Sequence, residues 1–234
     1  MHRNDPLTPA ALPRRGFLSN LGATVAGVLT LGVATRTTTA SAQRGPAPAS
    51  NALSQDTWLD GLDGQHGQIF EAPALHGGAA LKQSRNFLDV YRDVYGLESS
   101  EVDVAIAAHG SALSLFFQDR VWEKFGLGER FDVKDPRTGT AARRNVFASR
   151  EEGGVVPADA SVEALQDRGV IFLLCNNALN GLAGRLAQAG LGTPEAVRAD
   201  ILAALLPGAQ VVPAAVVALS RAQEKGLSYV YSGG

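Results

Sequence analysis

The chain has 234 residues, of which 21 are lysine or arginine and 23 are aspartate or glutamate, giving a formal net charge of −2. A weakly acidic chain without a basic cluster argues against a protein that binds nucleic acid through its charge. The chain contains one cysteine, so it cannot form an internal disulfide. That cysteine is therefore buried, bonded to another chain or used chemically.

The first 42 residues have the pattern of an export signal that takes no part in the fold. Arg14 and Arg15 form a twin-arginine pair, and residues 17–33 form a mildly apolar stretch interrupted by polar side chains. This stretch is too short and too polar for a convincing membrane span, although an uncleaved anchor is the alternative. Because the twin-arginine route exports folded bacterial proteins, we expect a periplasmic or exported protein.

A cleavage site follows the apolar stretch, with Ala40 and Ala42 in its two small-residue positions. We therefore expect the mature chain to begin at Gln43. The segment removed holds four arginines and one aspartate, which leaves 17 basic and 22 acidic residues and a net charge of −5. No second apolar stretch would tie this mature chain to a membrane.

The mature chain is expected to start with a flexible leader, residues 43–65, followed by one α/β domain at residues 66–234. Apolar runs, helical periodicity, capping residues and glycine stops predict strands that alternate with helices. The expected strands are 66–72, 102–108, 170–175, 209–212 and 227–231, and the expected helices are 78–96, 111–125, 160–168, 177–188, 193–206 and 213–225. Several strands are apolar throughout, which predicts a three-layer α/β sandwich with a mostly parallel five-stranded sheet.

Two further features of this pattern are expectations about packing. On the first helix, five residues share one apolar face: Phe87, Leu88, Tyr91, Val94 and Tyr95. Residues 126–157 have no sustained periodicity, and a segment of this length is expected to be a lid, a binding loop or a solvated excursion. The aromatic residues around it, including Trp122 and Phe125, either line a pocket or anchor the segment to the core.

Cys175 closes the most apolar strand and is followed at once by a helix that begins with Asn176 and Asn177. The carboxyl ends of parallel strands are where open α/β sheets place their sites, and a helix amino end favours a thiolate. His109 ends another strand, so the two side chains share a crevice if those strands are neighbours. The alternatives are a buried, inert cysteine and a histidine bonded to backbone at a strand end.

The sequence gives little support for a metal site or a dinucleotide-binding site. The mature chain has only three histidines, no pair of them has the spacing of a zinc enzyme, and there is no Cys-x-x-Cys motif. The glycines at 61, 64 and 67 do not lie between a strong strand and a helix, so they are not a dinucleotide loop. We therefore expect no cofactor.

The order of several short blocks resembles the DsrE/DsrF-like family of small α/β proteins that are linked to sulfur relay. The blocks are the strand ending in His109-Gly110, residues 165–170, Cys175-Asn176-Asn177-Ala178-Leu179, Val211-Val212-Pro213-Ala214, Ala222-Gln223 and Gly226–Val230. The chain is most similar to the exported, largely uncharacterised branch of that superfamily. The match covers about residues 66–120 and 158–232, so the 126–157 segment is an insertion.

The resemblance implies a flavodoxin-like sheet, a homo-oligomer and a cysteine that carries a persulfide, a role that maps only onto Cys175. Sulfur-relay members of the family act in the cytoplasm with donor or acceptor proteins, whereas this chain is expected to be exported. The leading expectation is an exported protein that binds or relays sulfane sulfur through Cys175, at most a sulfur carrier or transferase. His109, Asn176 and Asn177 would stabilise its thiolate. The alternative is a non-enzymatic periplasmic binding or assembly module with an inert cysteine.

Overall fold

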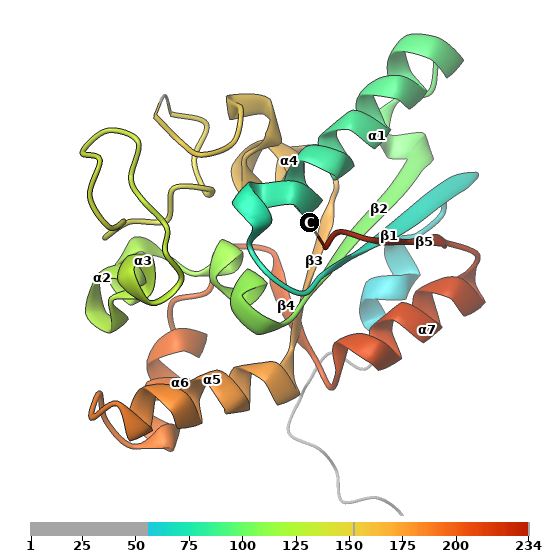
Figure 1. Cartoon of the computed structure of the whole chain (residues 1–234). Coiled ribbons are helices and arrows are strands. Elements are labelled where there is room, and N and C mark those ends of the chain that lie inside the picture. Colours follow the sequence, from blue (N-terminus) through green and yellow to red (C-terminus); the bar gives the residue numbers. More distant parts are fainter. Residues whose placement is uncertain (1–55, 152, 234) are drawn as a thin grey trace, which may run out of the picture. The chain divides into compact units, whose positions relative to one another are not determined.

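The computed structural model describes residues 56–151 and 153–233 (Figure 1). The predicted twin-arginine signal and cleavage site, with Arg14, Arg15, Ala40 and Ala42, lie outside the described residues. The domain is built on a five-stranded sheet in which every strand pair is parallel, in the order β4-β3-β2-β1-β5. Helices cover both faces, so the predicted three-layer α/β sandwich is confirmed.

The observed elements follow the predicted alternation closely. The strands are β1 (His66–Ala72), β2 (Val102–Ala108), β3 (Ile171–Cys175), β4 (Ala209–Val212) and β5 (Ser228–Tyr231). The α-helices are α1 (Ala79–Tyr95), α2 (Asp119–Phe125), α3 (Leu127–Arg130), α4 (Val162–Asp167), α5 (Asn176–Gln188), α6 (Pro194–Leu202) and α7 (Ala215–Lys225). Short 3-10 helices are η1 (Thr57–Gly61), η2 (His76–Gly78), η3 (Ser99–Glu101), η4 (Gly110–Phe116) and η5 (Ala158–Ala160).

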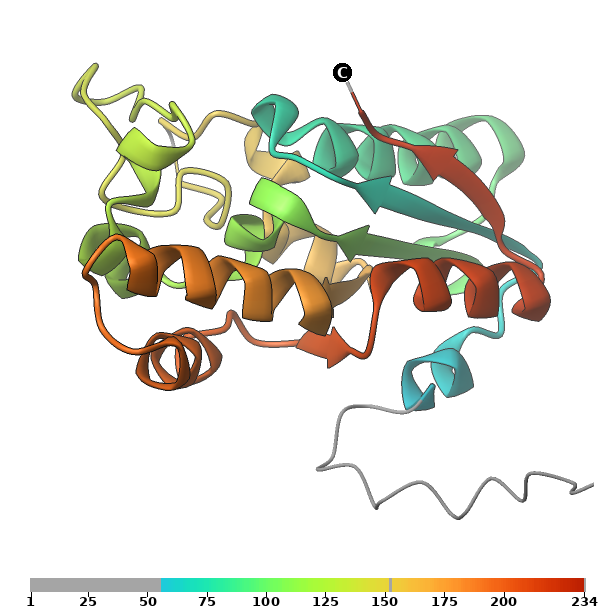
Figure 2. The same ribbon diagram turned by 60° about the horizontal axis from the view of Figure 1, so that its bottom comes forward.

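The connections divide the helices between the two faces of the sheet. The first three crossovers step in one direction from β1 to β4, and α1, α4 and α5 bury their apolar side chains in the same core. The last crossover returns past three strands to β5, and α7 packs with η1 against the opposite face (Figure 2). This strand order differs from the 2-1-3-4-5 order of flavodoxin, because here only the last connection reverses direction.

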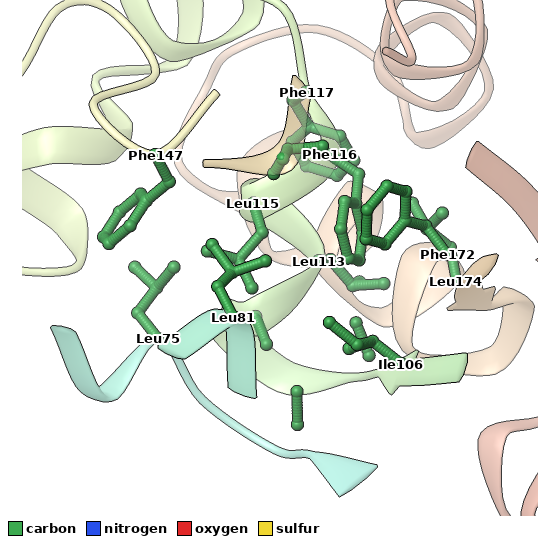
Figure 3. Close-up of a cluster of buried hydrophobic side chains, with 14 of the residues drawn as sticks. Leu75, Leu81, Ile106, Leu113, Leu115, Phe116, Phe117, Phe147, Phe172 and Leu174 are labelled. Carbon is green, nitrogen blue, oxygen red and sulfur yellow. The ribbon is translucent and has the colours of Figure 1, made fainter. Parts of the chain in front are cut away.

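The larger core lies between the sheet and α1, α4 and α5. Phe172 of β3 packs against Phe116 of η4, with ring centroids 4.8 Å apart (Figure 3). Figure 3 also shows Phe147, from the long 126–157 segment, in the same cluster as Leu75 and Leu115. Burial of such side chains contributes roughly 2 kcal/mol each, so the long segment is anchored by its own apolar residues.

One predicted helix is two helices in the structure. The sequence pattern indicated a helix at 111–125, but η4 ends at Phe116 and α2 starts at Asp119. Between them the backbone is extended, because Gln118 donates its N–H to the carbonyl of Ala204 and the carbonyl of Phe116 accepts from Leu206. These long-range hydrogen bonds, which local periodicity does not encode, end the first helix.

The predicted apolar face of α1 is wrong at its carboxyl end. Leu88 is buried, but Val94 is 70% exposed and Tyr95 is 65% exposed. All buried residues of α1 lie between Ala80 and Leu88. Beyond them the half-buried Tyr91 still packs against the core, whereas Val94 and Tyr95 lie outside it.

The prediction of a flexible leader at residues 43–65 is wrong for the part of this range that the structure describes. Residues 57–61 form η1, and Trp58, Leu59 and Leu62 are buried against the α7 face of the sheet. The reason is that α7 alone covers only part of this face, and the apolar side chains of η1 cover more of it. Within the described parts of the chain, no helix combines the length and apolar character needed to cross a membrane.

Candidate functional site

The carboxyl edge of the sheet brings together two residues that the sequence singled out. Ala108 of β2 is paired in register with Leu174 of β3, so His109 and Cys175 are the next positions on these neighbouring strands. The N–H of His109 donates to the carbonyl of Ala72 at 2.9 Å, which continues the strand pairing to this residue. Side chains alternate along a strand, and neighbouring strands lie about 4.8 Å apart. The two positions therefore face the same side of the sheet, and β2 and β3 are interior strands as predicted.

Cys175 has the position of a helix N-cap. Its backbone is extended, and its Sγ accepts a hydrogen bond from the N–H of Ala178 at 3.4 Å, in the first turn of α5. The residue is 7% exposed and belongs to the core on the α7 face of the sheet. The thiol is thus nearly covered, and it is polarised by a backbone donor and by the amino end of a helix.

Two helices begin beside Cys175. In register, Cys175 pairs with Val212 of β4, and α7 starts three residues after Val212. Figure 2 shows α5 and α7 running away from this region in opposite directions, so both amino ends lie at the ends of β3 and β4. Because the connection after β3 goes to one face and that after β4 to the other, this is the topological switch point of the sheet, where ligands bind in open α/β folds.

His109 is held by a residue that the sequence reasoning missed. Its Nε2 atom lies 2.9 Å from Oε1 of Glu71, which is the penultimate residue of β1. The hydroxyl of Tyr229 in β5 donates to Oε2 of the same carboxylate. This hydrogen bond raises the pKa of Tyr229 to about 12, and desolvation and the carboxylate charge add to the effect.

The signal for Glu71 was present in the sequence. It is an acidic residue that directly follows the apolar pair Ile69-Phe70 near the end of β1, at the same strand level as Ala107. Its side chain is 16% exposed and that of His109 is 31% exposed. The alternative of a histidine side chain bonded to backbone is therefore wrong, because the ring of His109 pairs with a carboxylate. In the described part of the chain, neither Cys175 nor His109 donates or accepts a side-chain hydrogen bond to the other.

The two asparagines after Cys175 have different surroundings. Asn176 accepts a hydrogen bond from Arg198 of α6 at 2.8 Å, and the same guanidinium donates to Asn180. Asn177 is exposed at the start of α5. Asn176 thus joins α5 to α6 through Arg198, and its side-chain oxygen is directed to that arginine rather than to the thiol.

The aromatic residues near the long segment act as anchors. Trp122 and Phe125 are buried in the main core, and the indole N–H of Trp122 donates to the carbonyl of Ser114 at 3.0 Å.

Across residues 56–151 and 153–233, no group of three or more histidine, cysteine, aspartate and glutamate side chains is placed to hold a metal ion.

No family model matches the chain, and no curated protein matches its sequence. Among solved structures, a protein of unknown function from Methanobacterium thermoautotrophicum is similar, with a TM-score of 0.38 and 17% sequence identity over 71% of this chain and 98% of that chain. Such a similarity carries no argument about function, so functional inference depends on the residues at the sheet edge.

Proposed function

We propose that this protein binds or relays sulfane sulfur through Cys175, in keeping with its resemblance to the DsrE/DsrF-like family. The observation that carries the proposal is the position of the thiol at the N-cap of α5 and beside the start of α7. Cys175 also occupies the position on β3 that lies opposite His109 on the neighbouring strand. Helix amino ends carry partial positive charge, so both helices favour an anionic sulfur at this point. His109, placed by Glu71, supplies a nearby base.

The chemistry is a sulfur transfer to the thiolate. The Cys175 thiolate attacks the terminal sulfur atom of a polysulfide. A new S–S bond forms between this atom and Sγ, and the bond from this atom to the rest of the polysulfide breaks. The shortened polysulfide leaves as a dianion, and the cysteine becomes a persulfide anion, so charge and atoms balance. The persulfide is a larger anion than the thiolate, and the same helix amino ends stabilise it. A donor or acceptor protein would supply or remove the sulfur.

The test is mass spectrometry of the native protein after exposure to polysulfide. A gain of one sulfur, about 32 Da, located on Cys175 is expected, because the thiolate is the species that attacks sulfane sulfur. Cys175→Ser removes little volume and should abolish the adduct without unfolding the protein. A native protein that gains no sulfur and resists alkylation until it is denatured would overturn the proposal.

The second candidate is a binding or assembly module in which Cys175 is inert. The specific observation in its favour is the 7% exposure of Cys175, since free cysteines that serve only packing are usually buried. Alkylation separates the two candidates. A reactive thiol is labelled in the folded protein, whereas an inert one is labelled only at the rate at which the domain opens.

We further propose that the protein acts after twin-arginine export and as a homo-oligomer. Export is supported by the order of Arg14, Arg15, Ala40 and Ala42 in the sequence. Replacing both arginines with lysine should leave uncleaved precursor in the cytoplasm, and unchanged export of that variant would contradict the assignment.

A further inference from the structure

Three strands contribute to a chain of hydrogen bonds at the carboxyl edge of the sheet. Tyr229 from β5 donates to Oε2 of Glu71 in β1, and Oε1 of Glu71 lies 2.9 Å from Nε2 of His109, which follows β2. Each oxygen of the carboxylate therefore has one side-chain partner. Glu71 is the more buried member of its pair with His109, so these hydrogen bonds form in a site that is partly shielded from solvent.

The direction of each hydrogen bond follows from the chemistry of the groups. Because the pKa of Tyr229 is raised to about 12, its phenol keeps its proton and is the donor. A carboxylate that accepts from Tyr229 through one oxygen accepts from His109 through the other. The Nε2 atom of His109 then carries the proton, and the Nδ1 atom of the neutral ring is left with a free lone pair.

We propose that Glu71 and Tyr229 are positioning residues that hold His109 in its Nε2–H tautomer, so that Nδ1 is the base for the Cys175 thiol. The assignment of the tautomer stands on the hydrogen bonds alone, whereas the role of Nδ1 rests on the proposed function. In the proton transfer, the S–H bond breaks and an Nδ1–H bond forms, with no change in oxidation state. The resulting imidazolium faces the Glu71 carboxylate, which stabilises its charge.

Five titratable groups of the described strands share the sheet face with His109. Glu71 comes from β1, Cys175 from β3, and Tyr229 and Tyr231 from β5, where Tyr231 is paired in register with Glu71. Asp103 lies six residues before His109, at the other end of β2. Among these groups, Glu71 is the anion in direct contact with the ring. A change at Glu71 should therefore alter the protonation pattern of His109, whereas a change at Tyr231 should not.

The first experiment reads the tautomer of His109 by nitrogen-15 NMR of the full chain, at a pH above about 7.5, where most imidazoles are neutral. Wild-type protein should show Nε2–H for His109. Glu71→Gln should shift the population toward Nδ1–H, since an amide offers both a donor and an acceptor, and Tyr229→Phe should shift it less. Tyr231→Phe is the matched control and should leave the signals of His109 unchanged. The signals of His66 and His76 should be the same in every variant.

An Nδ1–H tautomer in the wild type, or unchanged signals in both Glu71→Gln and Tyr229→Phe, would overturn the proposal. If Glu71→Gln does not fold, Tyr229→Phe still decides the question, because it removes one hydroxyl from a half-exposed side chain. This measurement involves no sulfur chemistry, so its outcome is independent of whether Cys175 carries sulfur.

The second experiment measures the rate of Cys175 alkylation against pH. Glu71→Gln should slow alkylation near neutral pH by about tenfold or more, because the base is no longer held in its productive form. The difference should vanish at high pH, where the thiol ionises without assistance. Equal pH profiles for wild type and Glu71→Gln would reject the role of Nδ1. A thiol that is not labelled in native wild type would reject the proposed function but leave the tautomer assignment standing.

Discussion

At the scale of single residues, Asn145 shows how one polar side chain can organise an irregular segment. It is 2% exposed, and its Nδ2 atom donates to the carbonyls of Leu115 and Phe117, both at 2.8 Å. Its Oδ1 atom accepts from the N–H of Phe147 at 3.0 Å. These bonds satisfy the backbone groups where η4 ends, so the asparagine replaces the helical hydrogen bonds that are missing there.

Asn145→Ala should therefore destabilise the domain by about 3 kcal/mol, because it leaves two buried carbonyls and one N–H without partners. The midpoint of urea unfolding should fall while the slope stays the same. Asn86→Ala, at an exposed position of α1, is the matched control and should change stability by less than about 0.5 kcal/mol. Equal effects of the two substitutions would show that the hydrogen bonds of Asn145 contribute little.

At the scale of elements, the 126–157 segment is held by a partly buried ion pair. Arg144 donates to both oxygens of Asp135, at 2.7 and 3.0 Å, and to the carbonyl of Gly153 at 2.8 Å. Asp135 is 7% exposed. The hydrogen bond from Arg144 lowers the pKa of Asp135, with smaller contributions from the backbone N–H and the charge of Arg137. The segment is thus closed on itself by one arginine.

Arg144→Gln should destabilise the protein by about 2 kcal/mol, since a buried carboxylate loses its charged partner. Arg143→Gln is the control, because Arg143 is exposed and pairs with Glu123 in solvent, and it should have an effect of less than about 1 kcal/mol. Urea unfolding at neutral pH measures both.

The ion pair of Arg144 and Asp135 should contribute to the stability of the fold in a way that depends on acid pH. The folded-state pKa of Asp135 lies below the ordinary value of about 3.9, so the stabilisation is complete above that pH and is lost as the pH falls through the folded-state value. The stability difference between wild type and Arg144→Gln should therefore shrink on acidification below about pH 4. A difference that stays constant there would contradict the assignment.

At the scale of the whole molecule, most exposed apolar side chains lie on the edge strand β5 and on α1 and α7. Of the eight large hydrophobic residues that are exposed in the described parts of the chain, all but Leu191 lie on α1, α7 or β5: Val90, Val94, Tyr95, Val216, Val217, Tyr229 and Tyr231. A groove of about 450 Å³, lined by residues including Phe70, Phe87 and Val230, separates α1 from this edge. Open strand edges and apolar patches are typical of interaction surfaces.

The proposed homo-oligomer predicts that light scattering of the mature protein gives a mass of more than one chain. Val94→Glu should shift the mass toward one chain while leaving the unfolding free energy of the isolated domain nearly unchanged, since Val94 is 70% exposed. Ala199→Glu, at an exposed position of α6 away from this surface, is the control and should keep the oligomer. A wild-type protein that is monomeric at high concentration would contradict this prediction.

The amino-acid sequence by itself determined the alternation of strands and helices and the position of Cys175 at a strand-to-helix junction. Strands β1, β2 and β4 have the predicted bounds. For the buried β2 the reason is plain, because it is a short and almost wholly apolar run bounded by turn residues. The start of α6 was also predictable, since Thr193 caps the helix by accepting from the N–H of Ala196. These features depend on neighbouring residues, so local patterns encode them.

Only the tertiary structure decided how distant residues meet. The strand order places β1 between β2 and β5, and this brings Glu71 to both His109 and Tyr229, which lie 38 and 158 residues away. Long-range hydrogen bonds also ended the helix predicted at 111–125, and packing against the α7 face of the sheet buried η1. Partners at such separations are set by which strands pair and which faces are covered, and one sequence has no local pattern that specifies either.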